Sequence, residues 1–328
     1  MPRYTIHIGA HKTGTTYLQR VFHALRPALA GEGIVFPSHW AQSDDQPGHR
    51  KLYERLTDGA TDVLRDEFKA IAADEVLISS EDLSYLQEPH LSQLRTLLDG
   101  AAVTIVFYCR RWSEMMPSVW QERIKHGFFE TFPQFLAAVM KDPSRLDFVN
   151  FGRILDRYGS VFGRDDIRIG AYSAVTGAGI DLADHFAEKF LPKMRPLLHK
   201  ADNVLGSRPN QSLRPAEIEC IRTLNAMHAA SGGERGPALR DWFLREGHNH
   251  GAAELLAALG KSLHAIRLAD EQPELERLHQ QLWASYGDRV ADPHPEGRFF
   301  APRTHDIPIA PPLKPLTTLY QAFQASTG

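Results

Sequence analysis

Apolar residues recur along this chain with two periods, one typical of strands and one typical of helices. Apolar, β-branched runs predict strands at residues 4–8, 33–37, 76–79, 103–109 and 167–172. Between these runs, apolar residues three and four positions apart predict amphipathic helices at 17–29, 64–72, 91–98, 115–124, 132–140 and 148–162. Strands that alternate with helices in this way predict an α/β fold, with three layers in which helices flank a central parallel sheet.

Beyond residue 191 the strand signal fades, and the pattern becomes mostly helical. Helices are predicted at 215–229, 239–263, 275–286 and 316–323, with a polar turn region at 203–212. Seven prolines between Pro293 and Pro315 predict an extended stretch with little regular structure. We therefore expect an α/β core over 1–200, a helical region of the same domain over 201–292, and a proline-rich tail with a short helix over 293–328.

Composition indicates a globular protein with a sizeable core, since hydrophobic residues make up 43% of 328. The net charge of −3 does not indicate the strongly basic surface that is typical of proteins that bind nucleic acid. Two cysteines, Cys109 and Cys220, do not make a disulfide framework. No apolar run is long enough to span a bilayer, and a strand begins within a few residues of Met1 where a signal peptide would lie. These features lead us to expect a cytoplasmic protein.

The most informative segment joins the first predicted strand to the first predicted helix. It reads Gly9-Ala10-His11-Lys12-Thr13-Gly14-Thr15-Thr16. A glycine-bounded loop between a strand and a helix turns backbone N–H groups toward an anion, and the helix dipole adds positive potential. In nucleotide triphosphatases a lysine directly follows the second glycine. Here Thr15 stands at that position, and the lysine is Lys12. The alternative is a tight turn that binds no ligand.

A second polar site follows the strand predicted at 103–109. This strand ends at Arg110 and Arg111, and Ser118 lies eight residues after Arg110 on the next predicted helix. A guanidinium group can hold a phosphate through two parallel hydrogen bonds, and a hydroxyl adds another donor. Ligands of open α/β sheets bind beyond the carboxyl ends of the strands, where these groups are expected.

The segment His11-Lys12-Thr13-Gly14-Thr15-Thr16, followed by the aromatic Tyr17, resembles the 5′-phosphosulfate loop of sulfotransferases that use 3′-phosphoadenosine 5′-phosphosulfate (PAPS). The pair Arg110 and Ser118 is similar to the pair that holds the donor's 3′-phosphate in that family. The resemblance covers about the first 200 residues and implies a P-loop-containing fold. It further implies a bacterial, cytoplasmic type of enzyme.

The resemblance implies roles for individual residues and for the donor. PAPS would be the co-substrate, 3′,5′-adenosine bisphosphate the product, and no metal would be required. The donor's 5′ end would contact Lys12, Thr13, Gly14, Thr15 and Thr16, with Tyr17 beside the adenine. The acceptor would be a hydroxyl of a carbohydrate, glycolipid or other small hydroxylated metabolite, in a site shaped by the helical region 201–292. The C-terminal helix would dock on its own core or on a second subunit in a homodimer.

Sulfuryl transfer also needs a base for the acceptor hydroxyl and a cation for the leaving oxygen. Lys12 suits the cation. Glu81 is the predicted base, because it follows the strand at 76–79 and corresponds to the carboxylate base of the carbohydrate-modifying branch of the family. Asp82 and His11 are competing bases, and Ser80-Glu81-Asp82 could instead cap a helix. We expect His7, on the first strand, to be a packed, hydrogen-bonded histidine.

Two other functions are compatible with the same loop. An ATP-dependent P-loop kinase would bind magnesium ATP, although the displaced lysine disfavours it. A non-catalytic nucleotide-binding scaffold would keep the donor pocket without turnover. The histidines His248, His250, His294 and His305 complete no metal-binding motif.

Overall fold

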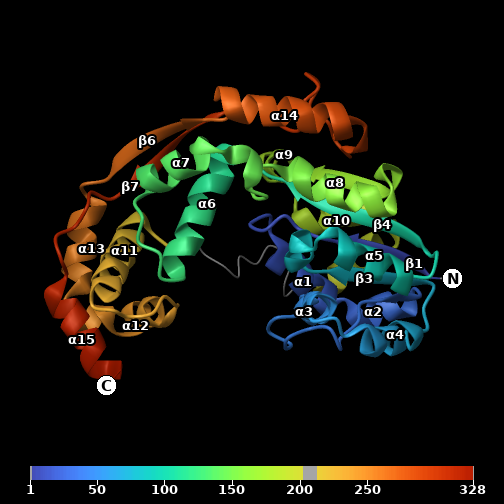
Figure 1. The fold of residues 1–328 in the computed structure, drawn as a ribbon, viewed down its shortest axis with the longest axis horizontal. Coiled ribbons are helices and arrows are strands. Elements are labelled where there is room, and N and C mark those ends of the chain that lie inside the picture. Colours follow the sequence, from blue (N-terminus) through green and yellow to red (C-terminus); the bar gives the residue numbers. More distant parts are fainter. Residues whose placement is uncertain (1, 202–212, 328) are drawn as a thin grey trace. The chain divides into compact units, whose positions relative to one another are not determined.

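The computed structural model describes residues 2–201 and 213–327, so the polar turn predicted at 203–212 lies outside the described residues. The chain divides into two compact units, and each is assembled from three stretches of sequence. The described residues of the first unit are 2–111, 144–201 and 273–301, and those of the second are 112–143, 213–272 and 302–327. The boundaries expected at residues 200 and 292 stay a prediction. The elements of each unit can be followed by colour in Figure 1.

Parallel strands form the sheet of the first unit, which confirms the predicted α/β fold. In the described part of the chain it has five strands, in the order β2-β3-β1-β4-β5. Their bounds are Arg3–His7 for β1, Ile34–Val35 for β2, Glu75–Ser79 for β3, Ala102–Cys109 for β4 and Ile167–Ala171 for β5. The central strand β1 pairs in parallel with β3 and β4, and its last residue His7 lies opposite Ser79 and Val106. The carboxyl ends of these three strands therefore meet at one edge.

Helices cover both faces of this sheet. On one face, His7 contacts Phe186 of α10 (Leu182–Phe190), with 5.7 Å between the ring centroids. A buried cluster on this face joins β3 and β4 to α10 and to α1 (Thr15–Ala24). On the other face, Phe107 contacts Phe151 of α8 (Phe151–Phe162), and Tyr4 contacts Phe68 of α4 (Thr61–Lys69). Adjacent strand residues point to opposite faces, so the nearly continuous apolar strands are buried on both sides.

The helices predicted at 64–72, 91–98, 148–162 and 275–286 are present in the first unit, whereas those at 50–57, 172–177 and 182–190 were not predicted. The bounds of this unit's helices are Thr15–Ala24 (α1), Arg26–Gly31 (α2), Arg50–Thr57 (α3), Thr61–Lys69 (α4), Glu88–Leu97 (α5), Phe151–Phe162 (α8), Tyr172–Gly177 (α9), Leu182–Phe190 (α10) and Pro273–Tyr286 (α14). The 3₁₀ helices of this unit include Glu81–Tyr85 (η1), Arg164–Asp166 (η3), Pro192–Ala201 (η4) and Gly287–Arg289 (η6). The single helix predicted at 17–29 is wrong, since α1 ends at Ala24 and α2 begins at Arg26. Pro27 explains the break, because it has no N–H and fits the first turn of a new helix.

The second unit is mostly helical. Its helices are α6 (Trp112–Lys125), α7 (Phe132–Lys141), α11 (Pro215–Ala230), α12 (Ala238–Glu246), α13 (Ala252–Gly260) and α15 (Thr317–Thr327), with a 3₁₀ turn η5 at Gly247–His250. The helix predicted at 239–263 is therefore interrupted. Gly251 adopts φ +85°, a left-handed conformation that a continuing α-helix does not allow.

The second unit also contains a strand pair that the sequence pattern did not predict. Strand β6 (His264–Ala269) pairs antiparallel with β7 (Thr304–Ile309). The stretch expected to have little regular structure between Pro293 and Pro315 thus carries a strand. Most residues of β6 are exposed or half-buried, so the strand lacks the apolar alternation that marks a half-buried strand.

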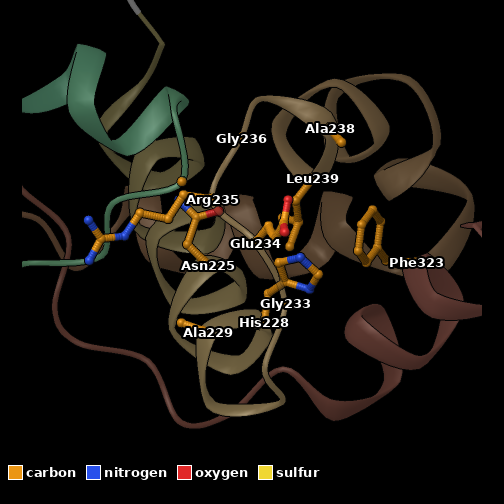
Figure 2. A pocket seen from close by; sticks show the side chains of 11 residues that line it. Asn225, His228, Ala229, Gly233, Glu234, Arg235, Gly236, Ala238, Leu239 and Phe323 are labelled. Carbon is orange, nitrogen blue, oxygen red and sulfur yellow. The ribbon is translucent and has the colours of Figure 1, made fainter.

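Each unit has a cavity, and residues of the loop that follows β1 line neither of them. In the second unit, Figure 2 shows His228 and Glu234 pointing into a space that Phe323 closes on one side. Its volume of about 30 Å³ has room for roughly one or two water molecules. In the first unit, a cavity of about 600 Å³ lies beside Tyr4 and Leu98, at the amino ends of β1 and β4. The predicted acceptor site within 201–292 stays a prediction.

The sheet edge beneath the loop is built from buried polar groups. His7 is fully buried, and its Nδ1 lies 2.9 Å from the Ser79 hydroxyl, which confirms the packed histidine. The backbone N–H of Ser79 donates to His49 Nδ1 at 3.2 Å. Burial lowers the pKa of His7 to about 4, because a buried imidazolium loses its hydration.

Within residues 2–201 and 213–327, no helix is both long enough and apolar enough to cross a membrane.

Acidification is expected to destabilise the protein through His7. The imidazole's ordinary pKa of 6.5 falls to about 4 in the folded state, so the unfolded state binds the proton first as pH falls. This group alone should remove about 2 kcal/mol of stability between about pH 7 and about pH 5. Urea unfolding at both pH values measures the loss. His7→Gln cannot be protonated, so its loss should be smaller, whereas an equal loss in the variant would contradict the assignment.

Candidate active site

The glycine loop leaves the sheet at the carboxyl end of β1, between β3 and β4. The N–H of Tyr108 donates to the Gly9 carbonyl at 2.7 Å, and the N–H of Ala10 donates to the Tyr108 carbonyl at 3.3 Å. The fully buried Thr13 hydroxyl donates to the Ala10 carbonyl at 2.6 Å. The Thr13 side chain therefore braces the loop from inside.

Gly14 is the N-cap of α1, with φ +77°. The left-handed conformation favours glycine, and a Cβ atom added there would lie 2.6 Å from Leu182 Cδ2, so the leucine side chain would have to move. This N-cap has no side chain, and no side-chain cap hydrogen bond is made to the first turn of α1, where Thr15 and Thr16 lie. The first backbone N–H groups of a helix have no partner within it, and they attract anions together with the dipole.

Lys12 and Arg110 meet at this loop. Lys12 has φ +64°, which a non-glycine residue rarely adopts. Arg110 Nη1 donates to the Lys12 carbonyl at 2.6 Å, and its Cζ lies 5.4 Å from the centroid of the Tyr172 ring. Arg110 therefore holds the loop in addition to any contact with a ligand. A guanidinium has five N–H donors, so this hydrogen bond leaves room for others.

Arg111, the other arginine at the end of β4, is buried and makes structural contacts within the first unit. It is 3% exposed, and its Nε donates to the Ala301 carbonyl at 2.9 Å. Its Nη1 donates to the Ser173 carbonyl, and its Cζ lies 5.2 Å from the Phe300 ring centroid. These contacts tie the end of β4 to later parts of the first unit.

Ser118 lies on α6, in the second unit, whereas Arg110 belongs to the first. The 3′-phosphate site predicted from this pair stays a prediction.

Tyr17, the predicted adenine neighbour, connects two helices. Its hydroxyl donates to Asp181 Oδ2 at 2.6 Å. The other carboxylate oxygen of Asp181 accepts from the backbone N–H of Ala183 at 2.8 Å and caps α10. The start of α1 is thereby fixed to the start of α10, and the adenine contact stays a prediction.

Glu81 lies directly against the loop. It begins η1, which follows β3, and the ladder continues as the Ser80 N–H donates to the His7 carbonyl at 3.0 Å. A Cβ atom built on Gly9 would lie 3.4 Å from both Cα and Cβ of Glu81. Because β1 and β3 are neighbours in the sheet, the structure brings the predicted base and the predicted anion loop together.

The two competing bases lie in the same region. Burial, and then the charge of Glu81, raise the pKa of the Asp82 carboxyl. His11 stacks on Tyr85, with 4.8 Å between the ring centroids. Burial raises the pKa of Tyr85 to about 12. The loop and η1 therefore place all three candidate proton acceptors at one end of the sheet.

Gln19 is a site residue that the sequence did not single out. It lies on α1 and is 5% exposed, and its Nε2 donates to Glu81 Oε2 at 2.7 Å. The available signal was its helical spacing from Thr15 and Phe22, which places a polar side chain on the buried face. A buried amide must find a hydrogen-bond partner, and here the partner is the candidate base.

Among the described residues, no group of three or more His, Cys, Asp or Glu side chains is arranged to hold a metal ion. The fold and this site define an α/β protein whose glycine loop, carboxylate and arginine lie together beyond the carboxyl ends of parallel strands.

Comparisons with known proteins do not assign this chain to a family. No family model matches the chain. No curated protein matches it either. Among solved structures, the chain is similar to a sulfotransferase from Alicyclobacillus acidocaldarius, with 15% sequence identity and a TM-score of 0.35. The match covers 73% of this chain and 99% of that one.

Proposed function

We propose that this protein is a sulfotransferase that moves a sulfuryl group from PAPS to a hydroxyl of a carbohydrate, glycolipid or other small hydroxylated metabolite. The observation that carries the proposal is the packing of Glu81 against Gly9, because it joins a proton acceptor to an anion-binding loop. The loop's resemblance to the 5′-phosphosulfate loop supports the choice of donor.

The loop fits an anionic group at its helix end. Gly14 contributes no side chain to the N-terminus of α1, and the side-chain cap of the first turn is missing. The backbone N–H groups over residues 12–16, with the Thr15 and Thr16 hydroxyls, would hold the 5′ end of the donor. Arg110 and Ser118 would hold the 3′-phosphate.

The chemistry assigned to the side chains is an in-line displacement at sulfur. The acceptor oxygen forms a bond to sulfur, and the bond from sulfur to the bridging oxygen of the donor breaks. Glu81 takes the acceptor's proton, and the Lys12 ammonium stabilises the negative charge on the leaving oxygen. The products are the sulfate ester and 3′,5′-adenosine bisphosphate.

Transfer of radiolabelled sulfate from PAPS to a panel of sugars, glycolipids and phenols tests the reaction itself. A sulfated product that forms with this chain and not with Glu81→Gln would support the proposal. Full turnover by a Lys12→Ala, Arg110→Ala double variant would refute it.

Donor-site binding is expected to depend on the 3′-phosphate. At a hundredfold excess over its Kd, 3′,5′-adenosine bisphosphate should stabilise the protein by ~2.7 kcal/mol, a melting shift of several degrees. The matched ligand 5′-AMP lacks only that phosphate and should stabilise less. Thermal shift measures both.

Ser118→Ala is the control for the 3′-phosphate contact, since Ser118 lies outside the loop that Arg110 braces. In this variant, the melting shift with 3′,5′-adenosine bisphosphate should exceed the shift with 5′-AMP by less than it does in the wild type. Stabilisation by magnesium ATP alone would contradict the sulfotransferase proposal and favour the kinase. Stabilisation by the bisphosphate without transfer to any acceptor would favour the scaffold.

A further inference from the structure

The helix that starts at the loop also holds the candidate base. Gln19 lies four residues after Thr15, one turn along α1, and its Nε2 donates to Glu81 Oε2 at 2.7 Å. Within the described residues, no hydrogen bond reaches Glu81 Oε1. One carboxylate oxygen is therefore occupied, and the other remains to accept a proton.

The Gln19 amide is itself held by close packing. A Cβ atom added at Gly48 would lie 2.6 Å from Gln19 Oε1 and 2.9 Å from Nε2, closer than real contacts allow. The backbone at Gly48 thus lies against the amide, and a side chain there would fit only if the amide moved. The next residue is bound to the sheet, because the His49 N–H donates to the Ser79 carbonyl at 2.8 Å. The amide lies between α1 and a segment fixed to β3.

We propose that Gln19 is a positioning residue for sulfuryl transfer, which orients Glu81 through a hydrogen bond from the helix that receives the donor. The inference rests on the proposed function. A single helix, α1, then positions both the donor's 5′ end and the base relative to the sulfur–oxygen bond that forms.

Gln19→Met keeps a long unbranched side chain and removes the amide. We expect kcat to fall roughly 10- to 100-fold, as for loss of one hydrogen bond to a charged group. The KM for PAPS and the thermal shift with 3′,5′-adenosine bisphosphate should stay unchanged, because the loop is intact. A merely structural role would lower the melting temperature without this separation of kcat from KM.

Gly48→Ala tests the same idea without changing Gln19. The added methyl group should displace the amide and produce a smaller change in the same direction. Gly31→Ala is the matched control, since a Cβ there meets no atom within 4 Å and its φ is not in the left-handed region. This control should behave as the wild type does.

The chemical shift of the Glu81 carboxylate carbon gives a readout that needs no turnover. It should change in Gln19→Met, because one hydrogen bond to the carboxylate is lost. Wild-type kcat and an unchanged carboxylate shift in this variant, alongside an inactive Glu81→Gln, would overturn the positioning role and leave the proposed function standing. Absence of sulfuryl transfer by the wild type would overturn both.

Discussion

Replacing Glu81 by glutamine is expected to lower kcat for sulfuryl transfer by about 10²- to 10⁴-fold, the usual contribution of a general base. The amide has nearly the shape of the carboxylate but cannot take the acceptor's proton. Donor binding should persist, because the loop N–H groups and Lys12 are unchanged. Steady-state kinetics, with thermal shift by 3′,5′-adenosine bisphosphate, separates the two effects.

Asp82→Asn and His11→Asn are the comparisons that decide which group is the base. Asp82 lies beside Glu81 in sequence, and burial raises the pKa of its carboxyl. His11 lies in the loop and stacks on Tyr85. If Glu81 is the base, both variants should retain far more activity than Glu81→Gln. A larger loss in either one would transfer the role to that residue.

Replacing Lys12 by methionine is expected to reduce kcat by about 10²- to 10³-fold, the scale seen when one group that stabilises transition-state charge is removed. Methionine retains a long unbranched side chain, which matters at φ +64°, where a β-branched residue would add strain. The hydrogen bond from Arg110 reaches the Lys12 backbone carbonyl, so it survives the change.

The effects of Lys12→Met on kcat and on the affinity for 3′,5′-adenosine bisphosphate distinguish a catalytic role of Lys12 from a binding role. A cation that meets the leaving oxygen should affect kcat more than the binding of 3′,5′-adenosine bisphosphate, because the charge develops in the transition state. Lys12→Arg should recover part of the rate, since it restores charge with a different geometry. Equal losses of rate and affinity in Lys12→Met would contradict the catalytic role and leave Lys12 as a binding residue.

The sequence by itself determined the elements around the sheet and the residues at its carboxyl edge. Strands β3 and β4 are nearly continuous apolar runs, since both faces of a covered parallel sheet are buried, whereas β1 mixes buried polar and apolar residues. The glycines of the loop and the polar residues directly after β3 and β4 can be recognised from their neighbours in the sequence. Lys12, Glu81 and Arg110 could therefore be singled out without coordinates.

Only the tertiary structure decided which of these groups touch. The order β3-β1-β4 places Glu81 against Gly9, and it places Arg110 where it donates to the Lys12 carbonyl. Strand order and register depend on contacts between residues far apart in sequence, so no local pattern reports them. The pairing of β6 with β7, whose strands are separated by α14, was missed for the same reason.

The contact between Gln19 and Glu81 shows this division most clearly. A glutamine on the buried face of an amphipathic helix is expected to have a hydrogen-bond partner, because an unsatisfied buried amide is costly. The sequence therefore predicts that a partner exists, but it does not identify the partner. The fold supplies the partner by packing α1 beside the end of β3, where one hydrogen bond joins the helix at the loop to the proposed base.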